Sequence, residues 1–112
     1  MRYLILPAIV LAFAAVGSAQ DPQPDQAAAG AVLFHDHCAK CHGVNLEGTK
    51  KGPALDKIRT KKYWTDEKIT NRINNGAGSK MPAFKDSLSS DQIQQLIAYL
   101  RAENRPTPPP AS

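Results

Sequence analysis

The sequence is short of the side chains that build a large protein interior. Of its 112 residues 42% are apolar, but 15 of these lie within residues 1–19. Beyond residue 19, eleven of the remaining apolar residues are alanine, which leaves 21 larger apolar side chains for a core. This supply limits the chain to one small domain and excludes a two-domain enzyme. The domain is therefore either marginally stable or gains apolar surface from elsewhere.

Cysteine and histidine are scarce as well. Two cysteines exclude a multi-disulfide scaffold. A structural zinc site needs four ligands, but no cysteine or histidine follows His42 to complete the pair Cys38 and Cys41. A thioredoxin-like redox pair requires a βαβ pattern, and the sequence shows no convincing strand alternation. A short-loop disulfide between the two cysteines is a further alternative, which leaves His42 without a role.

The first nineteen residues predict a secretory signal peptide. Arg2 supplies a positive charge, Leu4–Val16 is an apolar run broken only by Pro7, and small residues at 17–19 precede a cleavage position. A permanent membrane anchor is the alternative, but the run is short for a bilayer span of about 20 residues. We therefore expect an exported protein in the bacterial periplasm.

The rest of the chain divides into a linker, a domain and a tail. Residues 20–25 are polar and carry two prolines, which indicates a linker. Residues 106–112 are rich in proline and predict a disordered tail. The folded domain is therefore expected to cover residues 26–105.

Three segments within this domain have helical patterns, so the fold is expected to be all-α. The first is Gln26–Cys38, with Asp25 as its N-cap. The second is Asp66–Asn75, which Thr65 can cap and Gly76 can terminate.

The third helix has the clearest signals. Ser89 and Gln92 form a capping box, and an apolar stripe at helical spacing follows it before Pro106. The glycine-containing segments 43–62 and 76–88 are expected to be loops.

The segment Cys38-Ala39-Lys40-Cys41-His42 carries the chemistry. The pattern C-x-x-C-H is the attachment signature of haem c. Two thiols at this spacing can reach the two vinyl groups of one haem edge and form thioethers. The histidine that follows then lies beneath the iron as its proximal ligand.

Elimination points to Met81 as the second axial ligand. His35 and His37 lie too near the attachment site on the same helix to cross the haem plane, so they are expected to be solvated. Met81 is the one methionine left beyond the signal peptide, and Pro82 restrains it to extended geometry within a glycine-rich loop. The alternative, that Met81 only fills the core, fits a polar loop poorly.

These residues occur in an order that resembles a known family. The sequence is similar to class I monohaem cytochromes c of the small bacterial type over about residues 26–104. The matching segments, besides C-x-x-C-H, are Gly30-Ala31-Val32-Leu33-Phe34, Gly52-Pro53-Ala54-Leu55, Met81-Pro82-Ala83-Phe84 and Leu96-Ile97-Ala98-Tyr99-Leu100. The resemblance implies a cytochrome c fold, in which three main helices and loops surround one covalent haem.

The resemblance also implies roles for single residues. Gly30 and Phe34 should meet the last helix near Tyr99. The carbonyl of Pro53 should accept a hydrogen bond from the ring of His42.

Further haem contacts follow by the same resemblance. Leu55, Ile73 and Phe84 should line the haem pocket, although ordinary core packing explains them equally well. Tyr63 or Trp64 should hydrogen-bond a haem propionate, in a segment that varies within the family.

Charge indicates the kind of partner. The segment from Lys50 to Lys62 contains six basic side chains and only one acidic side chain. This excess can steer docking to an acidic redox protein, although a solvated loop would look the same. No nucleic acid or small-molecule substrate is expected, and membrane contact is expected only through partners.

Two functions fit this sequence. One is a free carrier that transfers single electrons between exported or membrane redox enzymes. The other is a haem subunit of a larger periplasmic oxidoreductase, such as a dehydrogenase complex. An enzyme in its own right is not expected, because two axial ligands leave the iron no open site.

Overall fold

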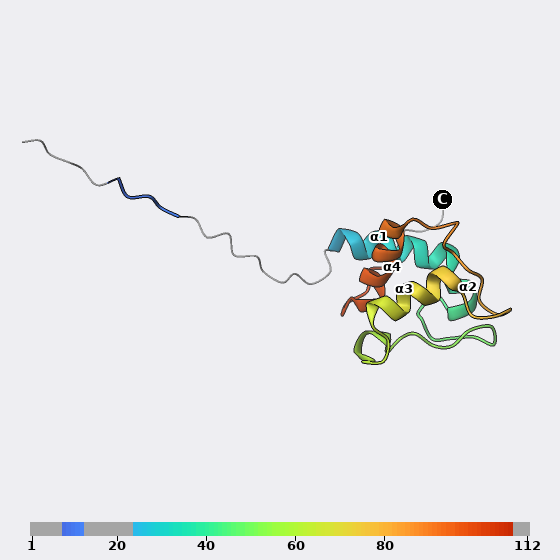
Figure 1. Cartoon of the computed structure of the whole chain (residues 1–112). Coiled ribbons are helices and arrows are strands. Elements are labelled where there is room, and N and C mark those ends of the chain that lie inside the picture. The colour runs from blue at the N-terminus through green and yellow to red at the C-terminus, as the bar shows by residue number, and fades with distance from the viewer. Residues whose placement is uncertain (1–7, 13–23, 109–112) are drawn as a thin grey trace, which may run out of the picture.

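The structure, a computed structural model, describes residues 8–12 and 24–108, and in these parts its regular elements are helices joined by long loops (Figure 1). The elements are α1 (Pro24–His37), α2 (Ala39–His42), the 3₁₀ helix η1 (Ile58–Thr60), α3 (Asp66–Asn75) and α4 (Ser90–Arg101). Over the described residues the chain forms no β-strand, only an isolated bridge between Ala77 and Met81. The all-α expectation is confirmed.

The first helix begins earlier than the sequence predicted. α1 starts at Pro24, so Asp25 lies in its first turn rather than at the N-cap, and the linker is shorter than expected. The fixed φ of proline suits the first helical position, where no N–H is needed. The carboxylate of Asp25 is favourable there because the N-terminal end of the helix dipole is positive.

The two later helices have the predicted caps. Thr65 Oγ1 accepts a 3.2 Å hydrogen bond from the Lys68 N–H at the start of α3. At the start of α4, Ser89 Oγ accepts from Gln92 N–H at 3.1 Å, and Gln92 Oε1 accepts from Ser89 N–H at 2.9 Å. This reciprocal pair is the capping box, and α4 ends at Arg101, before Pro106.

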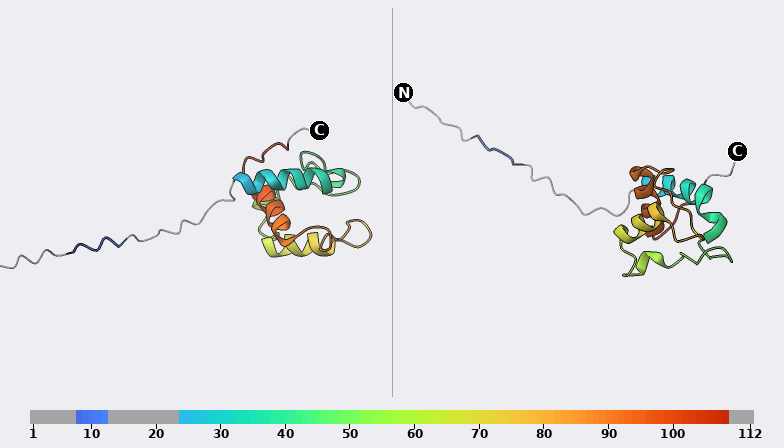
Figure 2. Two further views of the ribbon diagram at one scale, coloured as in Figure 1. Left: turned by 90° about the horizontal axis from the view of Figure 1, so that it is seen from above. Right: turned by 45° about the vertical axis from the view of Figure 1, so that its right-hand side comes forward.

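Helix α4 is the centre of the packing. Both α1 and α3 pack against α4, but no Cα atom of α1 lies within 8 Å of a Cα atom of α3. Figure 2 shows α1 and α3 on opposite sides, with α4 joining them at one end. The buried core follows this arrangement, with Phe34 from α1, Ile69 and Ile73 from α3, and Leu96 and Leu100 from α4.

Gly30 permits the close crossing of α1 and α4. A Cβ atom at Gly30 would overlap the carbonyl oxygen of Gln95 and lie 2.7 Å from Cβ of Tyr99. One turn along α1, the Phe34 ring lies 5.3 Å from the Tyr99 ring. The expected meeting of Gly30 and Phe34 with Tyr99 is therefore confirmed.

Parts of three predicted segments lie outside the described residues. These are residues 1–7 and 13–19 of the expected signal peptide, residues 20–23 of the linker and residues 109–112 of the tail. Residues 106–108 are described and carry no helix or strand. Among the described helices, none is long and apolar enough to cross a membrane.

Candidate functional site

The two cysteines and the histidine lie at the junction of α1 and α2. Helix α1 ends at His37, and a second short helix starts directly after Cys38. The N–H groups of Cys41 and His42 both donate to the carbonyl of Cys38, at 3.1 and 2.9 Å. The tight turn presents all three side chains half-buried on one short segment.

The cysteines form no disulfide in this structure, and the thiol of Cys38 has the wrong acidity for thiol exchange. Burial raises the pKa of Cys38 to about 12, with a smaller contribution from the neighbouring Cys41. The Cys38 thiol is therefore protonated near neutral pH, whereas exchange chemistry needs a thiolate of lowered pKa. This geometry disfavours a thioredoxin-like role for the pair.

The ring of His42 is oriented by a backbone carbonyl. Its Nδ1 lies 2.8 Å from the carbonyl oxygen of Pro53, which can only accept a hydrogen bond. Nδ1 therefore carries the proton, and the lone pair of Nε2 is left for another partner. The expected hydrogen bond between His42 and Pro53 is present.

The loop between His42 and Pro53 folds back onto the cysteine–histidine segment. Thr49 Oγ1 donates a 2.6 Å hydrogen bond to the carbonyl of Cys41 and accepts one of 3.0 Å from Lys51 N–H. The backbone N–H of Thr49 also donates to the Gly52 carbonyl at 2.9 Å. These bonds close a tight turn directly before Pro53, so Thr49 helps to aim the Pro53 carbonyl at His42.

Met81 lies in a tight loop after α3. Ala77 and Met81 exchange two backbone hydrogen bonds of 3.0 and 3.3 Å, which close the loop. Gly76 begins it with a φ of 71°, and a Cβ there would overlap the Met81 carbonyl and come within 2.8 Å of Pro82. Only glycine fits that position, and the half-buried Met81 is held at a fixed place in the loop.

The apolar residues expected at the haem lie against the core. Ile73 is buried, and Leu55 and Phe84 are half-buried against the same cluster. The N–H of Phe84 donates to the Ile73 carbonyl at 2.9 Å, which ties the loop that follows Met81 to α3. The Phe84 ring also lies 5.9 Å from the ring of His37, at the end of α1.

The two aromatic residues before α3 differ in exposure. Tyr63 is 67% exposed, with Lys68 Nζ 3.7 Å above its ring. Trp64 is half-buried against the core, and the Arg72 guanidinium lies 5.3 Å from its ring. Trp64 is therefore the better placed of the two to form part of an interior site.

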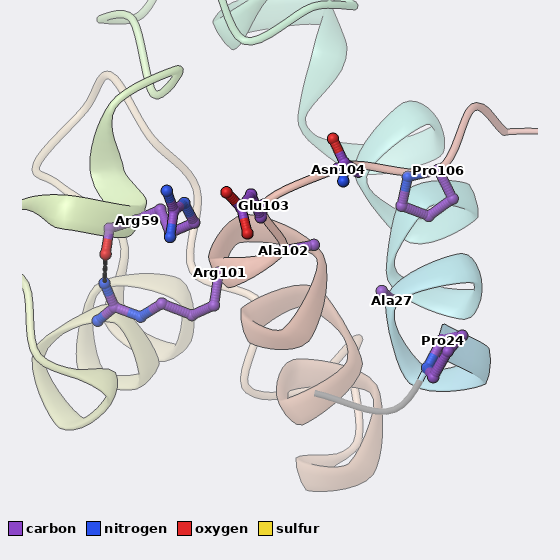
Figure 3. A pocket seen from close by; sticks show the side chains of 8 residues that line it. All are labelled: Pro24, Ala27, Arg59, Arg101, Ala102, Glu103, Asn104 and Pro106. Carbon is purple, nitrogen blue, oxygen red and sulfur yellow. Dashed lines mark hydrogen bonds between the residues drawn. The ribbon is translucent and has the colours of Figure 1, made fainter. Parts of the chain in front are cut away.

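One hollow in the surface lies away from the predicted site residues. It has a volume of about 330 Å³ and lies between the start of α1 and the end of α4 (Figure 3). Its walls include Ala27, Arg59 and Arg101, and none of the predicted site residues. The chemistry of the donor atoms, rather than this hollow, locates the site.

The residues at the α1–α2 junction fit haem c. Cys38 and Cys41 offer two half-buried thiols from one turn, and His42 offers Nε2 while its Nδ1 is already bonded. The backbones of α1 and α3, which both pack on α4, stay apart from each other, and their apolar faces suit a flat apolar cofactor between them. Haem c supplies an iron that accepts and releases single electrons.

Comparison with protein families supports the same cofactor. Residues 25–100 match the family described as cytochrome c oxidase, cbb3-type, subunit III. The chain belongs to this family of c-type cytochromes. This confirms the resemblance to class I monohaem cytochromes c.

Three curated relatives show the range of similar proteins. Cytochrome c6 of Leptolyngbya boryana is 40% identical over 66% of this chain and 88% of its own length. A cytochrome c6-like protein of Nostoc sp. is 38% identical over 63% of this chain and 65% of its own length. The cbb3-type cytochrome c oxidase subunit FixP of Bradyrhizobium sp. is 36% identical over 68% of this chain and 27% of its own length.

Solved structures have the same fold. Cytochrome cL of Methylophaga aminisulfidivorans is 32% identical with a TM-score of 0.64, over 72% of this chain and 55% of that one. Cytochrome c6C of Synechococcus sp. is 36% identical with a TM-score of 0.54, over 65% of this chain and 90% of that one. The protein has the cytochrome c fold, binds haem c through Cys38 and Cys41, and transfers electrons.

Three residues gain roles that the sequence did not reveal. Thr49 closes the turn before Pro53, and Gly76 shapes the Met81 loop besides ending α3. Arg101 reaches across to the segment around η1. A glycine directly after a helix indicates a turn, so the role of Gly76 could be predicted from the sequence. The contacts of Thr49 and Arg101 are long-range and leave no local sequence pattern.

Proposed function

We propose that the protein carries one electron at a time on a haem c whose axial ligands are His42 and Met81. The observation that carries this proposal is the hydrogen bond from His42 Nδ1 to the Pro53 carbonyl, which leaves Nε2 free to bind iron. The rigid loop around Met81 supports the second ligand. A thioether and an imidazole together favour a raised reduction potential.

The surrounding residues have supporting roles in this proposal. The Pro53 carbonyl fixes the orientation of His42 and raises its basicity. Leu55, Ile73 and Phe84 line the haem pocket and exclude water from it. Trp64 would donate a hydrogen bond to a haem propionate, and Tyr63 is the weaker candidate for this contact because its side chain is mostly exposed.

We assign the protein to the bacterial periplasm, after removal of residues 1–19. The domain then covers residues 24–105 and is flanked by short polar and proline-rich ends. In this assignment the haem has both axial positions filled, so the protein is a carrier and not an enzyme. It takes no small-molecule substrate and no nucleic acid.

The basic segment 50–62 is the proposed docking region for redox partners. Its six cationic side chains (Lys50, Lys51, Lys57, Arg59, Lys61 and Lys62) are all exposed. An acidic partner surface would complement them and raise the association rate, an effect that salt would weaken. Membrane contact then occurs only through such partners.

A bound subunit of a larger oxidoreductase is the second candidate. The similarity to FixP, of which this chain matches only 27%, shows that such domains also occur within longer oxidase subunits. Sedimentation of the native exported protein separates the two possibilities. A free carrier sediments as a protein of about 10 kDa, the size expected for roughly 93 residues, whereas co-purification in fixed ratio with a dehydrogenase or oxidase supports the subunit.

Optical spectra of the ferric protein test the ligand pair. Methionine ligation gives a weak long-wavelength band from sulfur to ferric iron, and Met81→Ala should abolish it. His35→Ala is the matched control, since the His35 side chain is exposed on α1. The assignment of Met81 is wrong if the band is absent in the native protein or survives Met81→Ala.

A further inference from the structure

Arg101, the last residue of α4, forms hydrogen bonds and an ion pair with several segments outside its own helix. Its Nη1 donates to the carbonyls of Ile58 and Arg59, at 3.0 and 3.3 Å, and its Nη2 donates to the carbonyl of Trp64. Its Nε lies 3.0 Å from Oδ1 of Asp66. One guanidinium thus joins the end of α4 to η1, to the residue before Thr65 and to the first turn of α3.

These contacts use most of the donors of a side chain that is only 20% exposed. A guanidinium holds its five N–H groups in one rigid plane, so several bonds fix its partners at once. The carbonyls that it meets belong to η1 and to the segment between η1 and α3, in which the Trp64 N–H donates to the Lys61 carbonyl at 3.1 Å. Figure 3 shows the Arg101 side chain reaching the Arg59 carbonyl.

We propose that Arg101 is a positioning residue, which fixes the backbone of Trp64 and thereby holds its indole against the haem. The inference rests on the proposed haem contact of Trp64. The half-buried indole packs against the core, and the Arg72 guanidinium lies 5.3 Å from its ring. Neither contact fixes the backbone, whereas the bond from Arg101 to the Trp64 carbonyl does.

The chain offers a direct probe, because Trp64 is its only tryptophan. Haem absorbs at the wavelengths where indole emits and quenches the emission steeply with decreasing distance. In the haem-loaded native protein we therefore expect Trp64 to emit very little fluorescence. In Arg101→Gln, the released segment should move the indole outward, so that native-state emission and its quenching by iodide both rise.

Two matched variants separate positioning from general support. Arg105→Gln removes an arginine whose Nη2 donates to the carbonyls of Asp56 and Leu100, at 3.2 and 3.3 Å, but not to Trp64. Asp66→Asn removes only the ion pair of Arg101. Both should keep native-state emission as low as in the unmodified protein. Arg101→Lys keeps the charge but not the rigid fork, so its emission should lie between those of the native protein and Arg101→Gln.

Each outcome decides the proposal. Emission that rises in Arg101→Gln but not in Arg105→Gln supports it. Unchanged native-state emission, even with a lower unfolding midpoint, overturns it, as does an equal rise in Arg105→Gln. If Arg101→Gln does not fold, the emission of Arg101→Lys decides in the same way. Bright emission from unmodified protein with a normal haem spectrum would instead show that Trp64 is far from haem, and an absent haem spectrum would contradict the proposed function itself.

Discussion

The hydroxyl of Thr49 lies 2.6 Å from the carbonyl oxygen of Cys41, and this contact ties the loop before Pro53 to the haem-attachment segment. The same hydroxyl accepts from Lys51 N–H at 3.0 Å. One exposed threonine therefore stabilises the turn from which the Pro53 carbonyl reaches His42. The relationship connects a loop residue to the electronic properties of the iron ligand, because a hydrogen bond at Nδ1 makes the imidazole a stronger donor.

Thr49→Val should raise the reduction potential of the haem. Valine keeps the shape but cannot bond to Cys41 or Lys51, so the turn loosens and the bond from His42 to Pro53 weakens. A less basic imidazole stabilises ferric iron less, which favours reduction. The unfolding free energy should fall by about 1 kcal/mol for the lost hydrogen bonds.

A redox titration with two companion variants checks this expectation. Thr49→Ser retains the hydroxyl and should restore the native potential. Thr60→Val removes a hydroxyl whose 3.3 Å bond to Lys57 lies in the separate η1 segment. A lowered potential in Thr49→Val, or the same shift in Thr60→Val, would show that Thr49 does not act through His42.

Gly76→Ala should disrupt the methionine loop. The added Cβ would overlap the Met81 carbonyl and lie 2.8 Å from Pro82, at a φ of 71° that alanine avoids. We expect the long-wavelength ferric band to weaken strongly and the potential to fall as the thioether is displaced. Absorption spectroscopy of the ferric protein measures both the band and the fraction of the protein affected.

The matched control for this loop is Gly78→Ala. Gly78 also has a positive φ, of 56°, but a Cβ there meets no atom within 4 Å. Gly78→Ala should lower the unfolding free energy only by the backbone strain, about 1 to 2 kcal/mol, and leave the band in place. If Gly78→Ala removes the band as fully as Gly76→Ala, steric contact with Met81 is not the reason.

The helices with strong local signals could be predicted from the sequence. The conformations of the loops could not. The bounds of α3 and the capping box of α4 follow from residues within four positions of one another, such as Ser89 and Gln92. The start of α1 could not be predicted in the same way, because Pro24 suits a polar linker as well as it suits a first helical turn.

The candidate site also has a part that the sequence predicts and a part that it does not. The motif from Cys38 to His42 is local, so sequence reasoning found it. The closing of the two loops by Thr49 and Gly76 depends on atoms that meet only after folding. Spacing alone cannot show which carbonyl a threonine will reach, nor that a Cβ after a helix would strike the loop beyond it.

Gly30→Ala should prevent α1 and α4 from packing closely. The new methyl group would overlap the backbone carbonyl of Gln95, which cannot move without bending α4. We expect a loss of about 3 kcal/mol or more in the unfolding free energy of the haem-loaded protein. Denaturant titration followed by far-UV circular dichroism measures this loss.

A second substitution in α1 calibrates the result. Ala28 is exposed, and Ala28→Gly should cost only about 1 kcal/mol from helix propensity. Equal losses in the two variants would mean that the crossing tolerates a methyl group at Gly30 and that the helices can separate at little cost.

Removing the haem should unfold most of the domain. The chain has 21 larger apolar side chains beyond residue 19, and α4 is the one helix against which both α1 and α3 pack among the described residues. Without a body between them, much of the apolar surface of α3 and of the Met81 loop loses its partner. Binding that occurs only in the folded state stabilises that state, so its loss shifts the equilibrium toward unfolded chain.

Cys38→Ser combined with Cys41→Ser tests this expectation, because serine cannot form the thioethers. The doubly substituted chain should show weak helical circular dichroism, no cooperative thermal transition and rapid proteolysis. The single variant Cys38→Ser retains one attachment point and should keep more of the fold. A cooperative transition in the doubly substituted, haem-free chain, with helical content equal to that of the native protein, would show that α4 and its neighbours hold the fold without the cofactor.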